Sequence, residues 1–172
     1  MRIVLYGTDL GWQHGEPRYL ADIAQEKGLG DLVSEEPSRV SYRRSLELLL
    51  DGDGALILGV DEAGYMPSKL YPYAYSGKPL LGVVRRDGPA FAAFETVPSL
   101  GHSLWFDDRG PMPQAQALAV LRAFLGEVIA RRVFDRRGEL EPFTASAMAR
   151  RHAELFEHIL SLNGTRAGGP IG

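Results

Sequence analysis

The fold is decided by residues 59–79, which read Gly59-Val60-Asp61-Glu62-Ala63-Gly64-Tyr65-Met66-Pro67-Ser68-Lys69-Leu70-Tyr71-Pro72-Tyr73-Ala74-Tyr75-Ser76-Gly77-Lys78-Pro79. Short apolar runs flank this segment, at residues 55–58 before it and 80–84 after it. Short apolar runs without alternation are typical of strands buried on both faces of a parallel sheet. We therefore expect a strand, a loop with one short helix, and a second parallel strand.

The helix inside this segment is predicted to span residues 67–76. Pro67 suits its first turn, and Pro79 prevents its continuation. Its inward positions recur at helical spacing: Leu70, Tyr73, Ala74 and Gly77. A helix that starts past the carboxyl end of a parallel strand directs free N–H groups at the crevice where phosphates bind. With the hydroxyl of Ser68 and the charge of Lys69, the pattern indicates an anion site; an ordinary strand–helix–strand unit with a solvated lysine is the alternative.

Residues 67–79 also resemble a known motif. They read Pro-Ser-Lys-Leu-Tyr-Pro-Tyr-Ala-Tyr-Ser-Gly-Lys-Pro, which is similar to the nucleotide-sugar-binding motif in the C-terminal domain of GT-B fold glycosyltransferases of the group 1, family 4 type. There the pattern runs Pro-Ser-Lys-Leu-x-Glu-Tyr, then small residues, then Gly-x-Pro. The resemblance extends more weakly over residues 1–160. It implies an α/β fold: a Rossmann-like three-layer sandwich with a parallel sheet of five or six strands and helices on both faces, which is one half of a GT-B fold.

The resemblance also implies a set of substrate-binding residues. Pro67, Ser68 and Lys69 would hold the diphosphate of a nucleoside diphosphate sugar, and the loop of Gly7 and Thr8 would lie beside it. The other contacts would come from Arg39 and Val40 at the base and from Glu62 near the sugar. Read from local chemistry alone, glycine permits close backbone approach and Thr8 offers a hydroxyl, but each of these loops is also compatible with simple solvation.

One position departs from the family pattern. Pro72 stands where the family carries a glutamate that would bond the ribose hydroxyls. Proline cannot do so, and in a helix that starts at Pro67 it would crowd the carbonyl of Ser68 at a cost of up to ~3 kcal/mol. The departure bears on nucleotide affinity rather than on the fold.

The remaining elements follow from periodicity and caps. Further strands are expected at residues 2–6, 32–34 and 103–106, and further helices at 17–27, 42–50, 89–96, 113–134 and 145–160. Ser41, Asp87 and Thr144 are expected to cap three of these helices. Asp61 and Glu62 form an acidic pair without further ligands at metal spacing, so no metal site is predicted.

Composition limits the other possibilities. The chain has 172 residues, a net charge of −3 and no cysteine. We expect one domain over residues 1–160 and a disordered tail over 161–172. The charge gives no drive toward nucleic acid, and no run approaches the roughly 18 apolar residues of a membrane span. A cytoplasmic protein is expected, either free or peripheral to a membrane, with neither a disulfide nor a cofactor.

The first functional hypothesis is a glycosyltransferase donor-binding domain that works without a metal. Its substrate would be a nucleotide sugar, and an N-terminal acceptor domain or a partner subunit would be needed for transfer, so no catalytic residue is assigned. The chain would then be an excised domain, a subunit of a split enzyme or a degenerate relative. The alternatives are a non-catalytic nucleotide or nucleotide-sugar binding module, and a flavodoxin-like domain with only the architecture in common.

Overall fold

The computed structural model describes residues 1–7 and 20–166, with side chains described as far as residue 162. These residues divide into two compact units, on either side of a boundary between Leu48 and Leu49. Thr8 and the expected start of the first helix lie outside the described residues.

The first unit contains a parallel strand pair. Strand β1 (Ile3–Tyr6) pairs with β2 (Val33–Glu36), and helix α1 (Leu20–Glu26) lies between them in sequence. The Glu35 carboxylate accepts the N–H of Ala21 at 2.9 Å, which attaches the start of α1 to β2. Helix α2 (Tyr42–Asp51) begins after Ser41, whose hydroxyl oxygen accepts the N–H of Arg44. The predicted cap at Ser41 is therefore confirmed.

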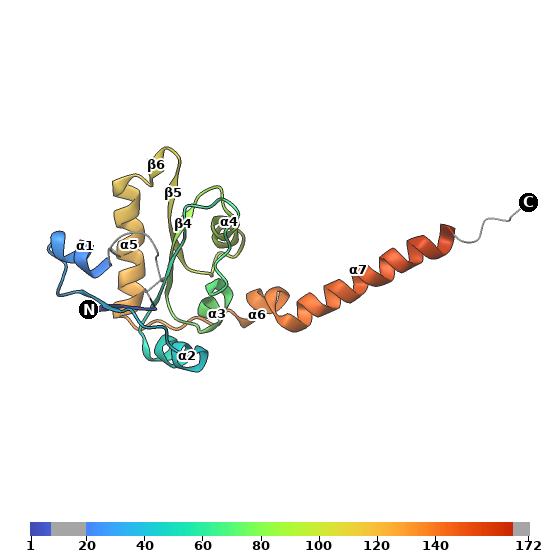
Figure 1. Cartoon of the computed structure of the whole chain (residues 1–172), viewed down its shortest axis with the longest axis horizontal. Helices are drawn as coiled ribbons and strands as arrows, with labels where there is room; N and C mark the ends of the chain where they lie inside the picture. The colour runs from blue at the N-terminus through green and yellow to red at the C-terminus, as the bar shows by residue number, and fades with distance from the viewer. Residues whose placement is uncertain (8–19, 167–172) are drawn as a thin grey trace, which may run out of the picture. The chain divides into compact units, whose positions relative to one another are not determined.

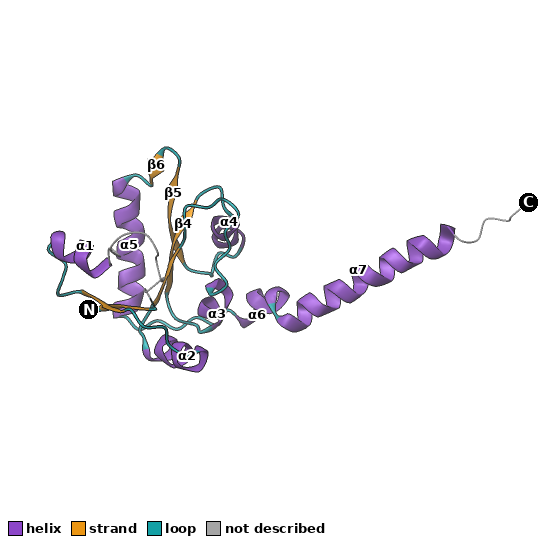
Figure 2. Cartoon of the chain, in the orientation of Figure 1, coloured by secondary structure: helices purple, strands orange, loops and turns teal. Residues whose placement is uncertain are grey.

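The second unit is built on a four-stranded sheet (Figure 2). Strands β3 (Ala55–Leu58), β4 (Leu80–Arg85) and β5 (His102–Asp107) are parallel, and β6 (Gly110–Pro111) returns antiparallel to β5. The α/β class is confirmed and is consistent with a Rossmann-like fold. The expectation of one parallel sheet of five or six strands is wrong, because the described strands form sheets of two and four. The tight turn after β5, where Asp107 accepts the N–H of Arg109, reverses the chain and ends the parallel order.

Helices α4 (Pro89–Thr96) and α5 (Gln114–Ile129) lie on opposite faces of this sheet (Figure 1). The ring of Phe94 in α4 lies over Gly82 of β4 so closely that an added Cβ would approach it to 2.6 Å. Phe124 of α5 meets the ring of His102 edge to face, with centroids 6.4 Å apart. Gly82 is thus needed for the packing of α4 against the sheet.

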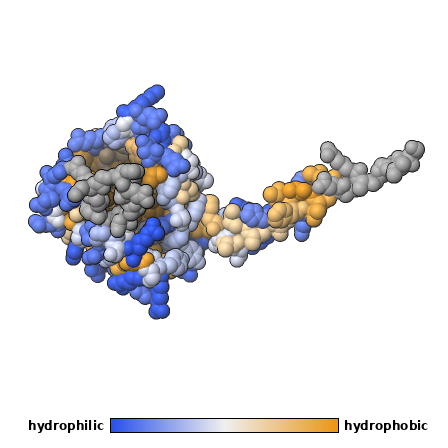
Figure 3. All heavy atoms as spheres, in the orientation of Figure 1, coloured by the Kyte–Doolittle hydropathy of each residue, from blue (hydrophilic) through white to orange (hydrophobic). Residues whose placement is uncertain are grey.

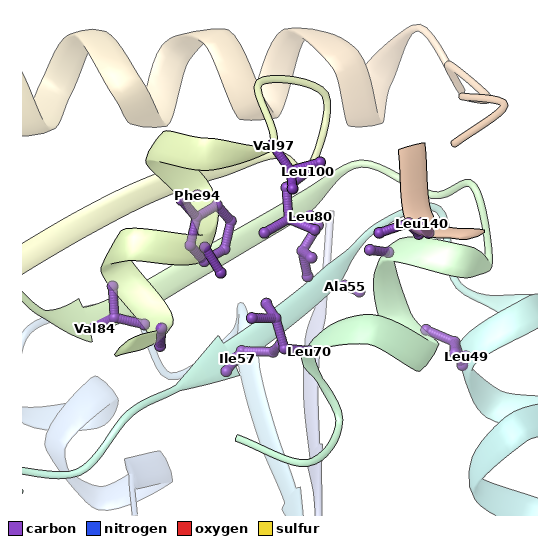
Figure 4. Packing of buried hydrophobic residues seen from close by; sticks show 13 residues of the cluster. Leu49, Ala55, Ile57, Leu70, Leu80, Val84, Phe94, Val97, Leu100 and Leu140 are labelled. Atoms are coloured by element: carbon purple, nitrogen blue, oxygen red, sulfur yellow. The ribbon is translucent and has the colours of Figure 1, made fainter. Parts of the chain in front are cut away.

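The hydrophobic core of the second unit lies between the sheet and helices α3 (Leu70–Tyr75) and α4 (Figure 4). Its fully buried large side chains include Leu70, Leu80 and Leu100, each with no exposed surface. Other members of the cluster are Leu49, Ala55, Ile57, Ala74, Val84, Ala90, Ala93, Phe94, Val97 and Leu140. The core therefore holds α3 by Leu70 and Ala74, two of the positions predicted to face the sheet.

A buried arginine fastens the chain after α5. Helix α5 ends at Ile129, earlier than predicted, because Arg131 adopts the left-handed conformation (φ +49°) that terminates helices. Arg136 follows, 2% exposed, just before α6 (Arg137–Leu140) and the 3₁₀ helix η1 (Glu141–Phe143). Its guanidinium donates to the carbonyls of Ala74 (3.1 Å), Lys78 (2.9 Å) and Ser99. Burial lowers its pKa from the ordinary value.

The last helix, α7 (Ala145–Arg166), begins with a cap and continues beyond its predicted end at residue 160. The hydroxyl oxygen of Thr144 accepts the N–H of Ala147 at 3.2 Å, which confirms the cap. Ala147 is buried, whereas all residues from Met148 to Leu162 are exposed. The end of the predicted tail, residues 167–172, lies outside the described residues.

Candidate functional site

The carboxyl edge of the second unit's sheet is organised by Arg85. This residue ends β4, and its guanidinium contacts three aspartates from three different connections. Asp61 follows β3, Asp87 follows β4 at 2.7 Å from Nε, and Asp108 follows β5 at 2.6 Å from Nη2. We refer to these four side chains as the Arg85 clasp. It connects the loops after three neighbouring parallel strands.

The electrostatics of the clasp limit what it can bind. The hydrogen bonds that Arg85 donates to Asp87, then to Asp108 and Asp61, raise the pKa of Arg85, and accepting from Arg85 holds the pKa of Asp87 below its ordinary value. The Arg85 side chain is only 13% exposed. Arg85 donates to all three carboxylates, and the negative charge that they place around its guanidinium disfavours a phosphate there. Asp87 therefore does not cap α4 as predicted; Gly88 holds that position without a side-chain bond.

Arg86, the next residue, is far more exposed than Arg85. Its guanidinium lies 4.4 Å from the ring centroid of Trp105 and 3.8 Å from a carboxylate oxygen of Asp107, and its side chain is 55% exposed. A guanidinium over the face of an indole still has N–H donors available to an anion. Of Arg85 and Arg86, Arg86 is the more accessible to a ligand.

The predicted phosphate site lies in the connection from β3 to α3. Pro67 is buried, whereas Glu62, Ser68 and Lys69 are exposed. The structure gives neither Ser68 nor Lys69 a side-chain partner among the described residues. The hydroxyl of Ser68 and the ammonium of Lys69 are therefore exposed, as the predicted phosphate site requires. Pro67 is buried and offers a ligand little surface.

The start of α3 differs from the prediction and changes the meaning of Pro72. The helix begins at Leu70, not at Pro67, with Lys69 as its N-cap. Pro72 is therefore the third helical residue, where no intrahelical N–H bond is needed, and Ser68 lies outside the helix. The expected clash and its cost are thus wrong: Pro72 is accommodated because the helix starts later. The N–H of Leu70 already donates to Pro67 O, so this first turn offers fewer free donors than predicted.

In the first unit, Gly7 and Arg39 lie close together at the carboxyl ends of β1 and β2. The N–H of Gly7 donates to Glu36 O at 2.9 Å, and an added Cβ on Gly7 would lie 3.8 Å from the Cα of Arg39. Gly7 has φ +71°, which favours glycine. Arg39 is exposed and Val40 is partly buried. The structure thus brings Gly7 and Arg39 together in one unit and Glu62, Ser68 and Lys69 along one loop of the other.

The clasp was missed by sequence reasoning, although a signal for it existed. Asp61, Asp87 and Asp108 each follow a predicted strand, and Arg85 ends one. The carboxyl ends of neighbouring parallel strands meet at one edge of the sheet, so this set of charges could have been grouped. Among the described residues, no cluster of three or more His, Asp or Glu side chains has the geometry of a metal site.

Comparisons with known proteins give no further assignment. No family model matches the chain, and neither a curated protein nor a solved structure gives a significant match. Within the described ranges, no helix has the length and apolar content that a membrane span requires.

Proposed function

We propose that the chain is the donor-binding domain of a GT-B type glycosyltransferase, which binds a nucleoside diphosphate sugar and needs an acceptor domain or partner chain for transfer. One observation carries the proposal. The family-like segment 67–79 begins in the connection that follows the carboxyl end of a parallel strand, and it leaves Ser68 and Lys69 exposed. Ligands of open α/β folds bind at this edge.

The proposed role of Lys69 is electrostatic. Its ammonium would contact the diphosphate and stabilise the negative charge that develops on the leaving nucleoside diphosphate. The hydroxyl of Ser68 would donate to the same group. No divalent cation is needed in this scheme, because Lys69 supplies the positive charge. The Arg85 clasp, with its excess of carboxylates, would hold the connection in place without touching the phosphates.

The proposal is tested by calorimetric titration with UDP, GDP and ADP, each with and without magnesium. We expect one of them to bind with an affinity that does not depend on the metal. Lys69→Ala removes a charge-assisted contact of ~1.5–3 kcal/mol, which corresponds to an affinity loss of roughly 10- to 150-fold.

The matched control is Lys27→Ala, which removes the same charge at an exposed position of the first unit. It should bind like the parent protein. If Lys69→Ala and Lys27→Ala give the same affinity as the parent, the phosphate site is not at Lys69. If none of the nucleotides binds to the folded protein, the chain lacks a donor site of its own.

A second candidate function is a nucleotide-sugar binding module that does not transfer sugar. The observation in its favour is Pro72, which is exposed on α3 where the family carries a ribose-binding glutamate. The two functions differ in what happens to the donor. A donor domain supplied with its acceptor domain or partner chain releases the nucleoside diphosphate, whereas a binding module returns the nucleotide sugar intact, as anion-exchange chromatography of the reaction mixture would show.

A further inference from the structure

The exposed apolar surface of α7 is the starting point. Every residue of the helix from Met148 to Leu160 is exposed. Large apolar side chains are exposed along it: Met148 (41%), Leu155 (53%), Phe156 (63%), Ile159 (44%) and Leu160 (70%). Figure 3 shows apolar atoms gathered on the visible face of its C-terminal half. Most helical stability in proteins comes from packing an apolar face, so covering this surface would stabilise α7.

The spacing of these exposed residues indicates the kind of partner that could pack against them. Met148, His152, Leu155 and Ile159 follow one another at intervals of four, three and four residues. This is the heptad spacing of a helix that packs along a second helix. Phe156 and Leu160 lie beside this seam and widen it.

The seam, which consists of Met148, His152, Leu155 and Ile159, is complementary to the seam of a second copy that runs antiparallel to it. When two copies of α7 run antiparallel about a two-fold axis between residues 153 and 154, Met148 faces Ile159 of the second copy and His152 faces Leu155. The two-fold axis repeats both contacts, which is the self-complementarity that a symmetric dimer requires.

The charges on α7 favour the same direction. Arg150 and Arg151 precede the centre of the seam, and Glu154 and Glu157 follow it; Arg150 also lies 4.0 Å from Glu141. Arg150 and Glu157 lie on the side of the helix away from the seam, so the charges act only at a distance. An antiparallel pair sets the basic half of one helix along the acidic half of the other, whereas a parallel pair aligns like charges. The two arginines and two glutamates balance, so this segment has little attraction for an anionic lipid surface.

The area is sufficient for a specific contact. Each of the five exposed apolar side chains offers roughly 100 Å², about half of a large side chain's ~200 Å². Two copies together would bury about 1,000 Å², the lower limit of specific interfaces. We propose that α7 forms a homodimer of moderate affinity by packing antiparallel against α7 of a second copy of the chain.

Sedimentation equilibrium of the full chain tests the proposal. The parent protein should show a monomer–dimer equilibrium in the micromolar range. The double variant Leu155→Glu, Ile159→Glu should raise the dissociation constant at least about tenfold. Ser146→Glu, which adds a negative charge on the opposite side of the helix, should leave it unchanged. Replacing the polar seam residue, His152→Leu, should instead tighten the dimer.

The direction is tested by disulfide formation, since the chain contains no cysteine. A mixture of Met148→Cys and Ile159→Cys proteins should cross-link, and each alone should not. Cross-linking of each variant alone would show a parallel pair and overturn the proposal. A protein that stays monomeric up to ~1 mM, with His152→Leu equally monomeric, would also overturn it, and binding of that monomer to phosphatidylserine-containing vesicles would identify a lipid surface as the occupant.

Discussion

Removing the buried guanidinium of Arg136 should cost a large part of the second unit's stability. In Arg136→Met, the carbonyls of Lys78 and Ser99 lose the only donor that the described residues give them, whereas Ala74 O keeps the N–H of Gly77. An unsatisfied buried carbonyl costs about 1–3 kcal/mol. Two of them cost about 2–6 kcal/mol, and losing a desolvated charge offsets part of this. We expect a net loss of about 2–4 kcal/mol from a total of about 5–15 kcal/mol.

The assay is urea unfolding followed by far-UV circular dichroism and tryptophan fluorescence, since Trp105 lies in β5 of the same unit. The matched control is Arg137→Met, which removes a neighbouring charge whose side chain is 73% exposed and paired only with Asp135 among its ion pairs. A surface pair of this kind contributes about 1 kcal/mol or less. If Arg136→Met unfolds within about 1 kcal/mol of the parent, the three carbonyl contacts are not what stabilises this region.

The Arg85 clasp and Gly101, a glycine with positive φ, give two further predictions. Because Arg85 lowers the pKa of Asp87, the unfolded chain takes up that proton more readily, so this contribution is complete above about pH 4 and is lost as the pH falls through the lower, folded pKa. Asp87→Asn should therefore show a shallower decline in urea midpoint between pH 5 and pH 2 than the parent; equal slopes would exclude the pair as the cause. Gly101→Ala should destabilise by about 2–4 kcal/mol in the same urea assay, since φ is +146° and the new Cβ would lie 2.4 Å from Leu80 O. Gly126→Ala, in a helix with open space around it, is the control and should be neutral or slightly stabilising; similar losses in both would contradict the argument.

Local signals predicted several elements well. Helix α4 spans Pro89–Thr96 as predicted, because proline in the first turn and helical apolar spacing agree with its packing on the sheet. β3 was predicted at its observed bounds for a similar reason, since an uninterrupted apolar run requires burial. The caps at Ser41 and Thr144 depend only on neighbours three residues away, which the sequence displays directly.

The predictions failed where the end of a helix or the burial of a side chain depends on one unusual backbone conformation or on a contact between distant residues. The end of α5 depends on a left-handed Arg131, a residue type that gives no such signal. Nothing in the local sequence distinguishes Arg136 from its exposed neighbour Arg137, but Arg136 is buried because carbonyls from α3, the next turn and the loop before β5 converge on it. The candidate site was predicted only in part: exposed Ser68 and Lys69 follow from their loop, whereas two of the three partners of Arg85, Asp61 and Asp108, are 24 and 23 residues away.

The separation of the clasp's partners along the chain has a consequence for how the second unit assembles. Asp61 and Asp108 can meet Arg85 only after β3, β4 and β5 have aligned, since each carboxylate is carried by a different connection. Contacts between distant segments form late, after the entropy of closing the intervening loops has been lost. The clasp therefore acts on the lifetime of the finished sheet rather than on the speed of its formation: it slows the first separation of the strand ends.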